Sequence, residues 1–201
     1  MEEQNLKHEE SLRIIHEMIG NARSRIVDNG FGWLLWGSLI FLASLTTFFL
    51  IEGNFENTFL GWNIFGIAAV LIFLYNFIKP KRKRVKSYAD EILQWVDVGF
   101  AVSLFVIILS INISVRPNDG FGYLLMLYAF LMLIQGGAMH FKPLIFGAFI
   151  NWIGAIAIFF CTVFKYDMLI TAAAVFIGYI IPGIILYKQS KRNNKKYLAI
   201  N

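Results

Sequence analysis

Cysteine and charged residues are both scarce in this chain of 201 residues, and each scarcity excludes a class of protein. The single cysteine, Cys161, rules out an internal disulfide framework. Charged residues make up 15% of the chain, whereas a soluble globular domain carries about 25%. The sequence therefore fits neither a disulfide-stabilised secreted domain nor an ordinary soluble domain.

Apolar residues take the place of charge. Hydrophobic residues make up 58% of the chain, aromatic residues 16%, and the mean hydropathy is +0.62, while a soluble domain has about 45–50% apolar residues. This composition predicts an integral membrane protein. The net charge of +5 then indicates basic loops that set topology and contact anionic lipid, and we expect no nucleic-acid partner.

The N-terminal segment lacks the features of a cleaved signal peptide, which has a basic segment followed by an apolar one. Residues 1–30 instead carry glutamates at five positions, which are Glu2, Glu3, Glu9, Glu10 and Glu17. We therefore expect the first hydrophobic span to act as its own insertion signal.

Six apolar stretches are long enough to cross a membrane. A helix needs about 20 residues to cross a hydrocarbon core about 30 Å thick, and backbone inside that core has to hydrogen-bond within its own segment. The sequence therefore predicts an all-α bundle of six transmembrane helices. The expected spans are residues 31–51, 59–78, 92–113, 121–139, 144–164 and 168–187.

The distribution of lysine and arginine predicts the orientation of these spans. Only Arg116 and Lys165 fall on one side of the membrane, and the other 16 of the 18 basic residues fall on the opposite side. Basic loops favour the cytoplasm, so we expect both termini there. The expected cytoplasmic segments are residues 1–30, 79–91, 140–143 and the basic tail 188–201.

The largest basic cluster lies between the second and third spans. We predict that it anchors the cytoplasmic side and contacts anionic lipid headgroups, with a specific acidic partner as the alternative. Its residues are Lys79, Lys81, Arg82, Lys83, Arg84 and Lys86.

An amphipathic helix is predicted ahead of the first span, within residues 1–30. Apolar residues recur there every three or four positions, which is the spacing of one helix face. They are Leu12, Ile15, Ile19, Ala22 and Ile26. Three roles are open to this cytoplasmic helix: it lies in the headgroup plane, packs on the bundle's own loops, or binds a cytosolic protein through residues 8–28.

Four motifs follow one another along the chain: ESLRIIHEMIGNARSRIVDNG (10–30), GWLLWGSLIF (32–41), YADEI (88–92) and IPGIILYK (181–188). In these motifs, in length and in charge layout, the chain resembles a group of uncharacterised six-span bacterial inner-membrane proteins. The resemblance implies a bacterial cytoplasmic membrane. It implies no activity, because none is assigned to the group.

Catalytic and metal-binding signatures are incomplete. A zinc-protease HExxH motif needs a second histidine, but Leu12 and Gly20 stand at that position after the pairs His8-Glu9 and His16-Glu17. The stretch GFGWLL lacks the spacing of a GxGxxG dinucleotide motif and follows no strand. We therefore predict no enzyme activity, no metal and no cofactor.

Polar residues inside spans cost free energy, so they carry the most functional information. The sequence places a set of them in the cytoplasmic third of the bilayer, namely Asp97, Gln135, His140, Asn151 and Pro182. Pro182 has no N–H, so the Gly178 carbonyl loses its usual helical donor, which Asn151 or Gln135 could replace.

Two interpretations of this polar set are open. The first is a pocket, open to the cytoplasm, for a small solute, an ion or a proton. The second is structural: Asp97 reaches toward Lys86 or Arg84 of the basic loop, and the amides hydrogen-bond between helices.

The favoured functional prediction is a regulatory or scaffold protein that acts through its cytoplasmic face. That face would combine the amphipathic helix, the basic loop and the basic tail. The alternative is a small-solute, ion or proton-coupled transporter that uses the polar pocket.

Two similar hexapeptides suggest an internal repeat. GFGWLL (30–35) begins the first span and GFGYLL (120–125) begins the fourth, so an odd number of spans separates them. A duplicated half would then insert upside down, as the inverted repeats of many transporters do. This hypothesis predicts that spans one to three superpose on spans four to six; otherwise the similarity is chance.

Overall fold

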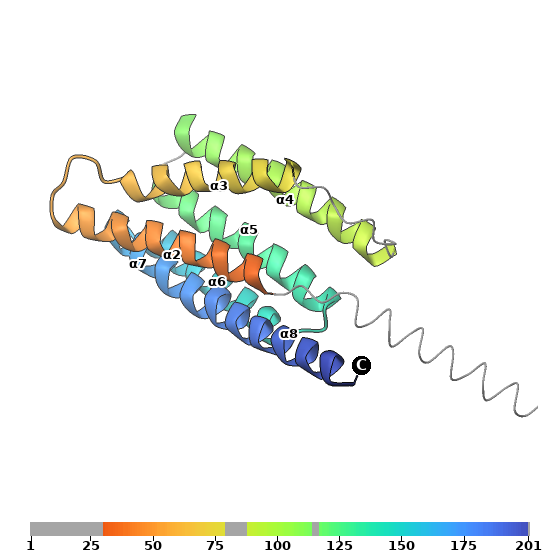
Figure 1. The fold of residues 1–201 in the computed structure, drawn as a ribbon. Helices are drawn as coiled ribbons and strands as arrows, with labels where there is room; N and C mark the ends of the chain where they lie inside the picture. The colour runs from red at the N-terminus through yellow and green to blue at the C-terminus, as the bar shows by residue number, and fades with distance from the viewer. Residues whose placement is uncertain (1–29, 79–87, 114–116, 201) are drawn as a thin grey trace, which may run out of the picture.

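The computed structural model describes residues 30–78, 88–113 and 117–200, and every regular element within these ranges is helical (Figure 1). The amphipathic helix expected within residues 8–28 and the basic cluster at residues 79–86 lie outside the described residues. The helices are α2 (Phe31–Glu52), α3 (Leu60–Ile78), α4 (Tyr88–Ile113), α5 (Pro117–Ala138), α6 (Lys142–Phe160), α7 (Phe164–Val175), η1 (Phe176–Ile180) and α8 (Ile181–Ile200).

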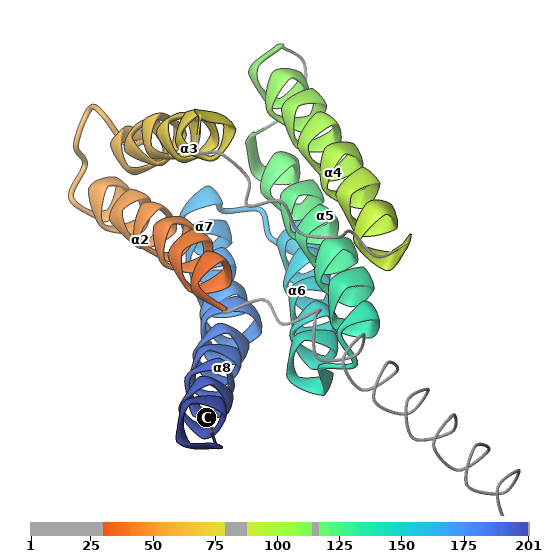
Figure 2. The same cartoon turned by 45° about the vertical axis from the view of Figure 1, so that its right-hand side comes forward.

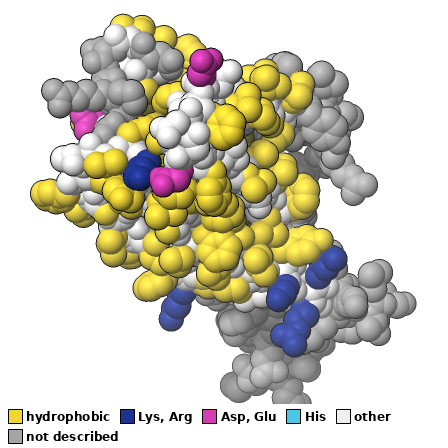
Figure 3. All heavy atoms as spheres, turned by 90° about the vertical axis from the view of Figure 1, so that its left-hand side faces the viewer, with side chains coloured by type: hydrophobic (Ala, Val, Ile, Leu, Met, Phe, Trp, Pro, Cys, Tyr) yellow, Lys and Arg dark blue, Asp and Glu magenta, His cyan; other side chains and the backbone are white. Residues whose placement is uncertain are grey.

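The prediction of an all-helical chain is confirmed for the described residues, and the apolar helices support a membrane protein. Five helical stretches of the described chain are long and apolar enough to cross a membrane: Phe31–Glu52, Glu91–Ile111, Asp119–Ala138, Lys142–Phe160 and Phe164–Arg192. Helix α3 adds the shorter apolar stretch Leu60–Ile72. Hydrophobic side chains cover most of the described surface on the face shown in Figure 3, and charged side chains there are few.

Proline and glycine mark the starts of three helices. α5 begins at Pro117, and α6 carries Pro143 in its first turn, where the missing proline N–H costs no hydrogen bond. Gly30, just before α2, has a φ of 71°, which a residue with a side chain adopts only with strain. A Cβ at Gly30 would lie 2.7 Å from the backbone nitrogen of Tyr187. The close contact between the start of α2 and α8 therefore depends on glycine.

Helices α7 and α8 form one continuous rod that is interrupted by the π-helical turn η1 (Phe176–Ile180). The Ile181 N–H donates to the Phe176 carbonyl, five residues back, which is the π-helical pattern. Pro182 follows directly, and its ring crowds the carbonyl four residues before it in a regular α-helix. The wider turn thus accommodates the proline without ending the helix.

Helices α5 and α6 are joined by a tight turn and pack closely along their length, and α2 packs on α7 and η1. The peripheral helices α3 and α4 pack on α2 and α5 respectively, without approaching each other closely in the described residues (Figure 2). Gly147 of α6 and Gly178 of η1 let two backbones meet: a Cβ on Gly147 would overlap the Gly178 carbonyl. Small residues allow such crossings in membranes, where apolar burial drives little association between helices.

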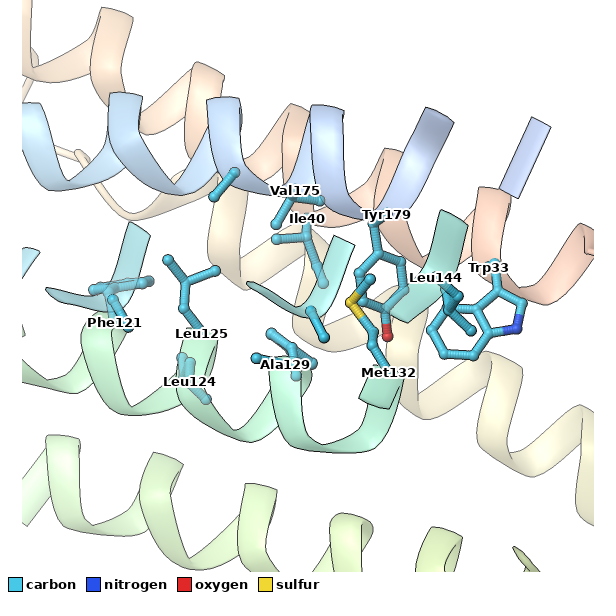
Figure 4. Packing of buried hydrophobic residues seen from close by; sticks show 14 of the residues in the cluster. Trp33, Ile40, Phe121, Leu124, Leu125, Ala129, Met132, Leu144, Val175 and Tyr179 are labelled. Atoms are coloured by element: carbon cyan, nitrogen blue, oxygen red, sulfur yellow. The ribbon is translucent and has the colours of Figure 1, made fainter. Parts of the chain in front are cut away.

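Large aromatic rings join the two sides of the bundle. Trp33 of α2 lies 4.9 Å from Tyr179 of η1, and Tyr179 lies 6.0 Å from Tyr128 of α5, measured between ring centroids. Figure 4 shows the Tyr179 side chain pointing from its helix into the buried space near Met132. Aromatic pairs at these separations each add about 0.5–1.5 kcal/mol beyond burial. The buried face of η1 is therefore held by aromatic rings from both α2 and α5.

Candidate functional site

Asp97 and Gln135 come together, although 38 positions separate them in the sequence. The Gln135 side-chain amide donates to the Asp97 carboxylate at 2.7 Å and joins α4 to α5. The Asp97 side chain is exposed on the surface of the protein, and the Gln135 side chain is half-buried. Such interhelical bonds inside membranes contribute about 0.6 kcal/mol on average. The hydrogen bond therefore orients the carboxylate more than it stabilises the bundle.

Two buried tyrosines, Tyr128 and Tyr179, lie on α5 and η1. The Tyr179 hydroxyl of η1 lies within electrostatic range of Asp97 and of Tyr128. The Tyr128 ring contacts Phe100 of α4 at 5.7 Å between centroids. The Trp36 indole approaches the Tyr128 hydroxyl without reaching hydrogen-bond geometry. We call Asp97, Gln135, Tyr128 and Tyr179 the inner polar centre.

Asn151 belongs to a different contact. It is fully buried, and its amide donates to the Gly147 carbonyl at 2.9 Å and to the Met132 sulfur at 3.6 Å. The amide also packs directly against Gly178. Asn151 thus lines the crossing of α6 and η1, and the amide hydrogen bonds that the structure records go to Gly147 and Met132.

The remaining members of the predicted pocket lie apart. Pro182 is buried in the first turn of α8. His140 is exposed in the turn between α5 and α6, with a φ of 52°. Its side chain makes no hydrogen bond or ion pair within the part of the chain that the structure describes. The polar set therefore divides into the inner polar centre, the Asn151 crossing beside Pro182, and a surface histidine.

A fully buried carboxylate, Asp167, was missed by the sequence analysis. It belongs to a KYD segment that the hydropathy pattern treats as an outer loop, but α7 begins at Phe164 and makes Asp167 part of its first turn. Asp167 is 0% exposed, and neither carboxylate oxygen has a hydrogen-bond partner among the described residues. The Thr171 hydroxyl donates to the Asp167 backbone carbonyl at 2.8 Å, not to its side chain.

The stabilising interactions around Asp167 do not offset the free-energy cost of burying its carboxylate in the charged form. Removing a carboxylate from water costs several kcal/mol even after the protein relaxes. The positive end of the α7 dipole stabilises a negative charge in the first turn by only about 0.3–1 kcal/mol. The Cys161 thiol lies beside the carboxylate, but its sulfur donates to the Val163 carbonyl at 3.5 Å.

Other charges and hydroxyls surround this end of the bundle. Lys165 is not available to Asp167 as an ion-pair partner, because its ammonium pairs with Glu52 at 2.9 Å. Asp119 of α5 adds a like charge within electrostatic range of Asp167. The hydroxyls of Ser44 and Thr47 on α2 are 0% exposed and, among the described residues, have no hydrogen-bond partner.

Among the described residues, no group of three or more histidine, cysteine, aspartate or glutamate side chains could hold a metal ion. Comparisons of the chain with protein-family models, with curated proteins and with solved structures found no match. The geometry of the Asp97 and Asp167 carboxylates is therefore the basis for assigning a function to this chain.

Proposed function

We propose that this chain is a six-span protein of a bacterial cytoplasmic membrane with both termini in the cytoplasm. The segregation of 16 of the 18 basic residues supports this orientation. The contact between Gly30 and Tyr187 supports placing the start of the first span and the basic tail on one side. The inverted duplication of spans one to three remains part of this proposal.

The function that the geometry supports best is a transporter for a small solute, an ion or a proton, centred on Asp97. The observation that carries it is the 2.7 Å hydrogen bond from Gln135 to Asp97, which fixes an ionisable group within the spans. Ionisable residues at such depth commonly mark ion or proton pathways. Tyr179 near Asp97 lies on the π-helical turn, and helix irregularities of this kind often occur at functional sites.

Charge displacement in reconstituted membranes tests this proposal. The full chain is placed in liposomes adsorbed to a solid-supported membrane, and concentration jumps of protons, sodium, potassium and small organic cations are applied. We expect a transient current for at least one of these ions in the wild type. Asp97→Asn should reduce it to background, because the amide keeps an acceptor oxygen but loses the charge. Glu52→Gln, at the outer end of α2, is the control that should retain it.

Equal currents from the wild type and Asp97→Asn would contradict the proposal, as would the absence of any current in the wild type. A current lost equally in Asp97→Asn and Glu52→Gln would assign the effect to misfolding. Recovery of each variant as a monodisperse peak in detergent separates that result from a loss of function.

The second candidate function is the regulatory or scaffold role of the cytoplasmic face. Helix α8 continues to Ile200, which favours this role because its basic side chains Lys188, Lys191 and Arg192 then extend the last span as a helix. The Lys191 ammonium lies 4.9 Å from the centroid of the Tyr187 ring. Together with the cluster Lys79–Lys86, this surface would contact anionic headgroups or an acidic protein.

Deleting residues 8–28 distinguishes the two functions. A scaffold would lose its cytosolic partners in affinity capture from the producing cell while retaining any cation-evoked current. A transporter would show the reverse dependence, with Asp97→Asn affecting the current and leaving the captured proteins unchanged.

A further inference from the structure

We propose that Asp167 forms a second, monovalent-cation site at the outer end of the bundle, where one proton or one sodium ion neutralises the carboxylate. The site goes beyond the proposed function, since it is built on α2 and α7 and shares no residue with the inner polar centre. One carboxylate carries one negative charge, so a single monovalent cation balances it. The buried hydroxyls of Thr47 and Ser44 on α2 lie further inward than this site.

The register of α2 against α7 and η1 places those hydroxyls one and two helical turns inward of Asp167. The two helices run antiparallel: Lys165 pairs with Glu52, Phe176 contacts Phe41 at 5.5 Å between centroids, and Ile180 lies beside Gly37. Interpolating between these contacts places Thr47 opposite Ile170, one helical turn from Asp167.

Ser44 lies one further turn along α2, opposite Ala173, on the same buried face as Thr47. Asp167 and Thr171 likewise belong to the buried face of α7. Side chains in a helix lean toward its N-terminus. Because α2 and α7 run antiparallel, the Thr47 and Ser44 hydroxyls lean inward while the Asp167 carboxylate leans outward, and no hydrogen bond joins them among the described residues.

Aromatic rings and an ion pair cover the outward side. Phe164, one turn before Asp167, contacts Phe59 at 5.6 Å and Phe121 at 5.7 Å between ring centroids. The Lys165–Glu52 ion pair lies next to it at the ends of α7 and α2. These groups lie at the same end of the bundle as Asp167, and none of them supplies a recorded partner for its oxygens.

Among the residues that the structure describes, which do not include Arg116, every charged or titratable group near the carboxylate leaves its negative charge unbalanced. The Cys161 thiol is a weak donor directed at Val163, Asp119 is itself acidic, and Lys165 is paired with Glu52. Buried charges in proteins are paired or bind an ion, and otherwise the group becomes neutral. A bound proton or sodium ion is the cation that this arrangement lacks.

Thermal unfolding of the full chain in detergent micelles, followed by its tryptophan fluorescence, tests the site. Two series are measured: sodium chloride exchanged against choline chloride at constant ionic strength and high pH, and a pH series without sodium. A ligand that binds only the folded state raises the melting temperature as its concentration rises. We expect the wild-type midpoint to rise by several degrees along one series. A rise with sodium identifies sodium, and a rise only with falling pH identifies the proton.

Three variants locate the effect. Asp167→Asn, neutral and nearly isosteric, should lose the part of the dependence that Asp167 contributes. Asp119→Asn should keep the full dependence, and Asp97→Asn should keep the part that Asp167 contributes. Loss of the dependence in Asp97→Asn but not in Asp167→Asn would overturn this site and leave the proposed transporter standing. A wild type insensitive to both sodium and pH would also overturn it.

A measurement on the wild type alone covers the case in which Asp167→Asn fails to fold. Infrared difference spectra of the protein between high and low pH, with and without sodium, report carboxyl protonation directly. A proton site gives a protonated-carboxyl band that ¹³C-labelled aspartate shifts, and a sodium site gives a shifted carboxylate band. Spectra without any aspartate signal in either comparison would contradict the proposal.

Discussion

The Gln135 amide of α5 donates to the Asp97 carboxylate of α4 at 2.7 Å, and this bond joins the peripheral helix α4 to the bundle. Helix α4 packs on α5 and approaches no other described helix closely. This polar contact orients the Asp97 carboxylate, while packing such as that of Phe100 on Tyr128 also holds α4 against α5.

Removing the amide should loosen α4 slightly without destroying the fold. We expect Gln135→Ala to lower the free energy of unfolding by about 0.6 kcal/mol, and by about 2 kcal/mol at most. Unfolding in mixed micelles with increasing sodium dodecyl sulfate measures this change. Asp97→Asn keeps an acceptor oxygen and should cost less than Gln135→Ala. A larger loss for Asp97→Asn would show that the charge of Asp97 itself stabilises the fold.

The crossing of α6 and η1 should tolerate no side chain at Gly147. A Cβ there would overlap the Gly178 carbonyl and lie 2.7 Å from the terminal carbon of Met132. We expect Gly147→Ala to cost about 1–3 kcal/mol of unfolding free energy, the usual penalty for overpacking. Gly137→Ala is the matched control, because nothing lies within 4 Å of a Cβ at Gly137. Equal effects of the two substitutions in the same micelle titration would refute the tight crossing.

Alanine substitutions at Gly30 and Gly32, at the start of α2, offer a similar matched comparison. Gly30 combines a φ of 71° with close contacts to the Tyr187 nitrogen and to the Gly183 carbonyl, at 2.7 and 2.9 Å from an added Cβ. The left-handed conformation alone costs about 1–2 kcal/mol for alanine. Gly30→Ala should therefore lower the melting temperature clearly, whereas Gly32→Ala, with open space around it, should leave it unchanged or raise it. The reverse order would show that α2 and α8 do not meet at Gly30.

The Lys165–Glu52 ion pair should contribute little to stability. Its side chains are 30% and 57% exposed, and exposed pairs contribute about 0–1 kcal/mol. Glu52→Gln should therefore shift the unfolding midpoint only slightly, and the shift should vanish at high salt. A large loss that persists at high salt would mean that the ion pair is shielded from solvent and stabilises the fold more than an exposed pair does.

Hydropathy could predict where the helices lie, because backbone in hydrocarbon has to be helical. It could not predict where they extend into water. Helix α4 begins at Tyr88, four residues before the expected start at residue 92, and α8 continues to Ile200 beyond the expected end at residue 187. Polar residues there continue the helix outside the apolar stretch, so hydropathy carries no signal of the extension.

The candidate sites were predictable only in part, because they depend on how each helix is rotated about its axis. Met132 and Gln135 lie one turn apart on α5, yet Met132 meets Asn151 and Gln135 meets Asp97. Similar depth in the membrane therefore did not imply contact between Asn151 and Asp97. Asp167 was missed for another reason: its burial follows from the start of α7 at Phe164, within a segment too polar to be assigned to a span.

The proposed topology places the inner polar centre and the basic tail near the cytoplasm and Asp167 near the outer surface. Labelling with a membrane-impermeant maleimide in intact bacterial cells tests this placement most directly. In a Cys161→Ser background, Glu56→Cys in the turn after α2 should be labelled in intact cells, and Lys188→Cys in α8 should be labelled only after permeabilisation. Labelling of Lys188→Cys from outside, or protection of Glu56→Cys until the cells are opened, would contradict the account.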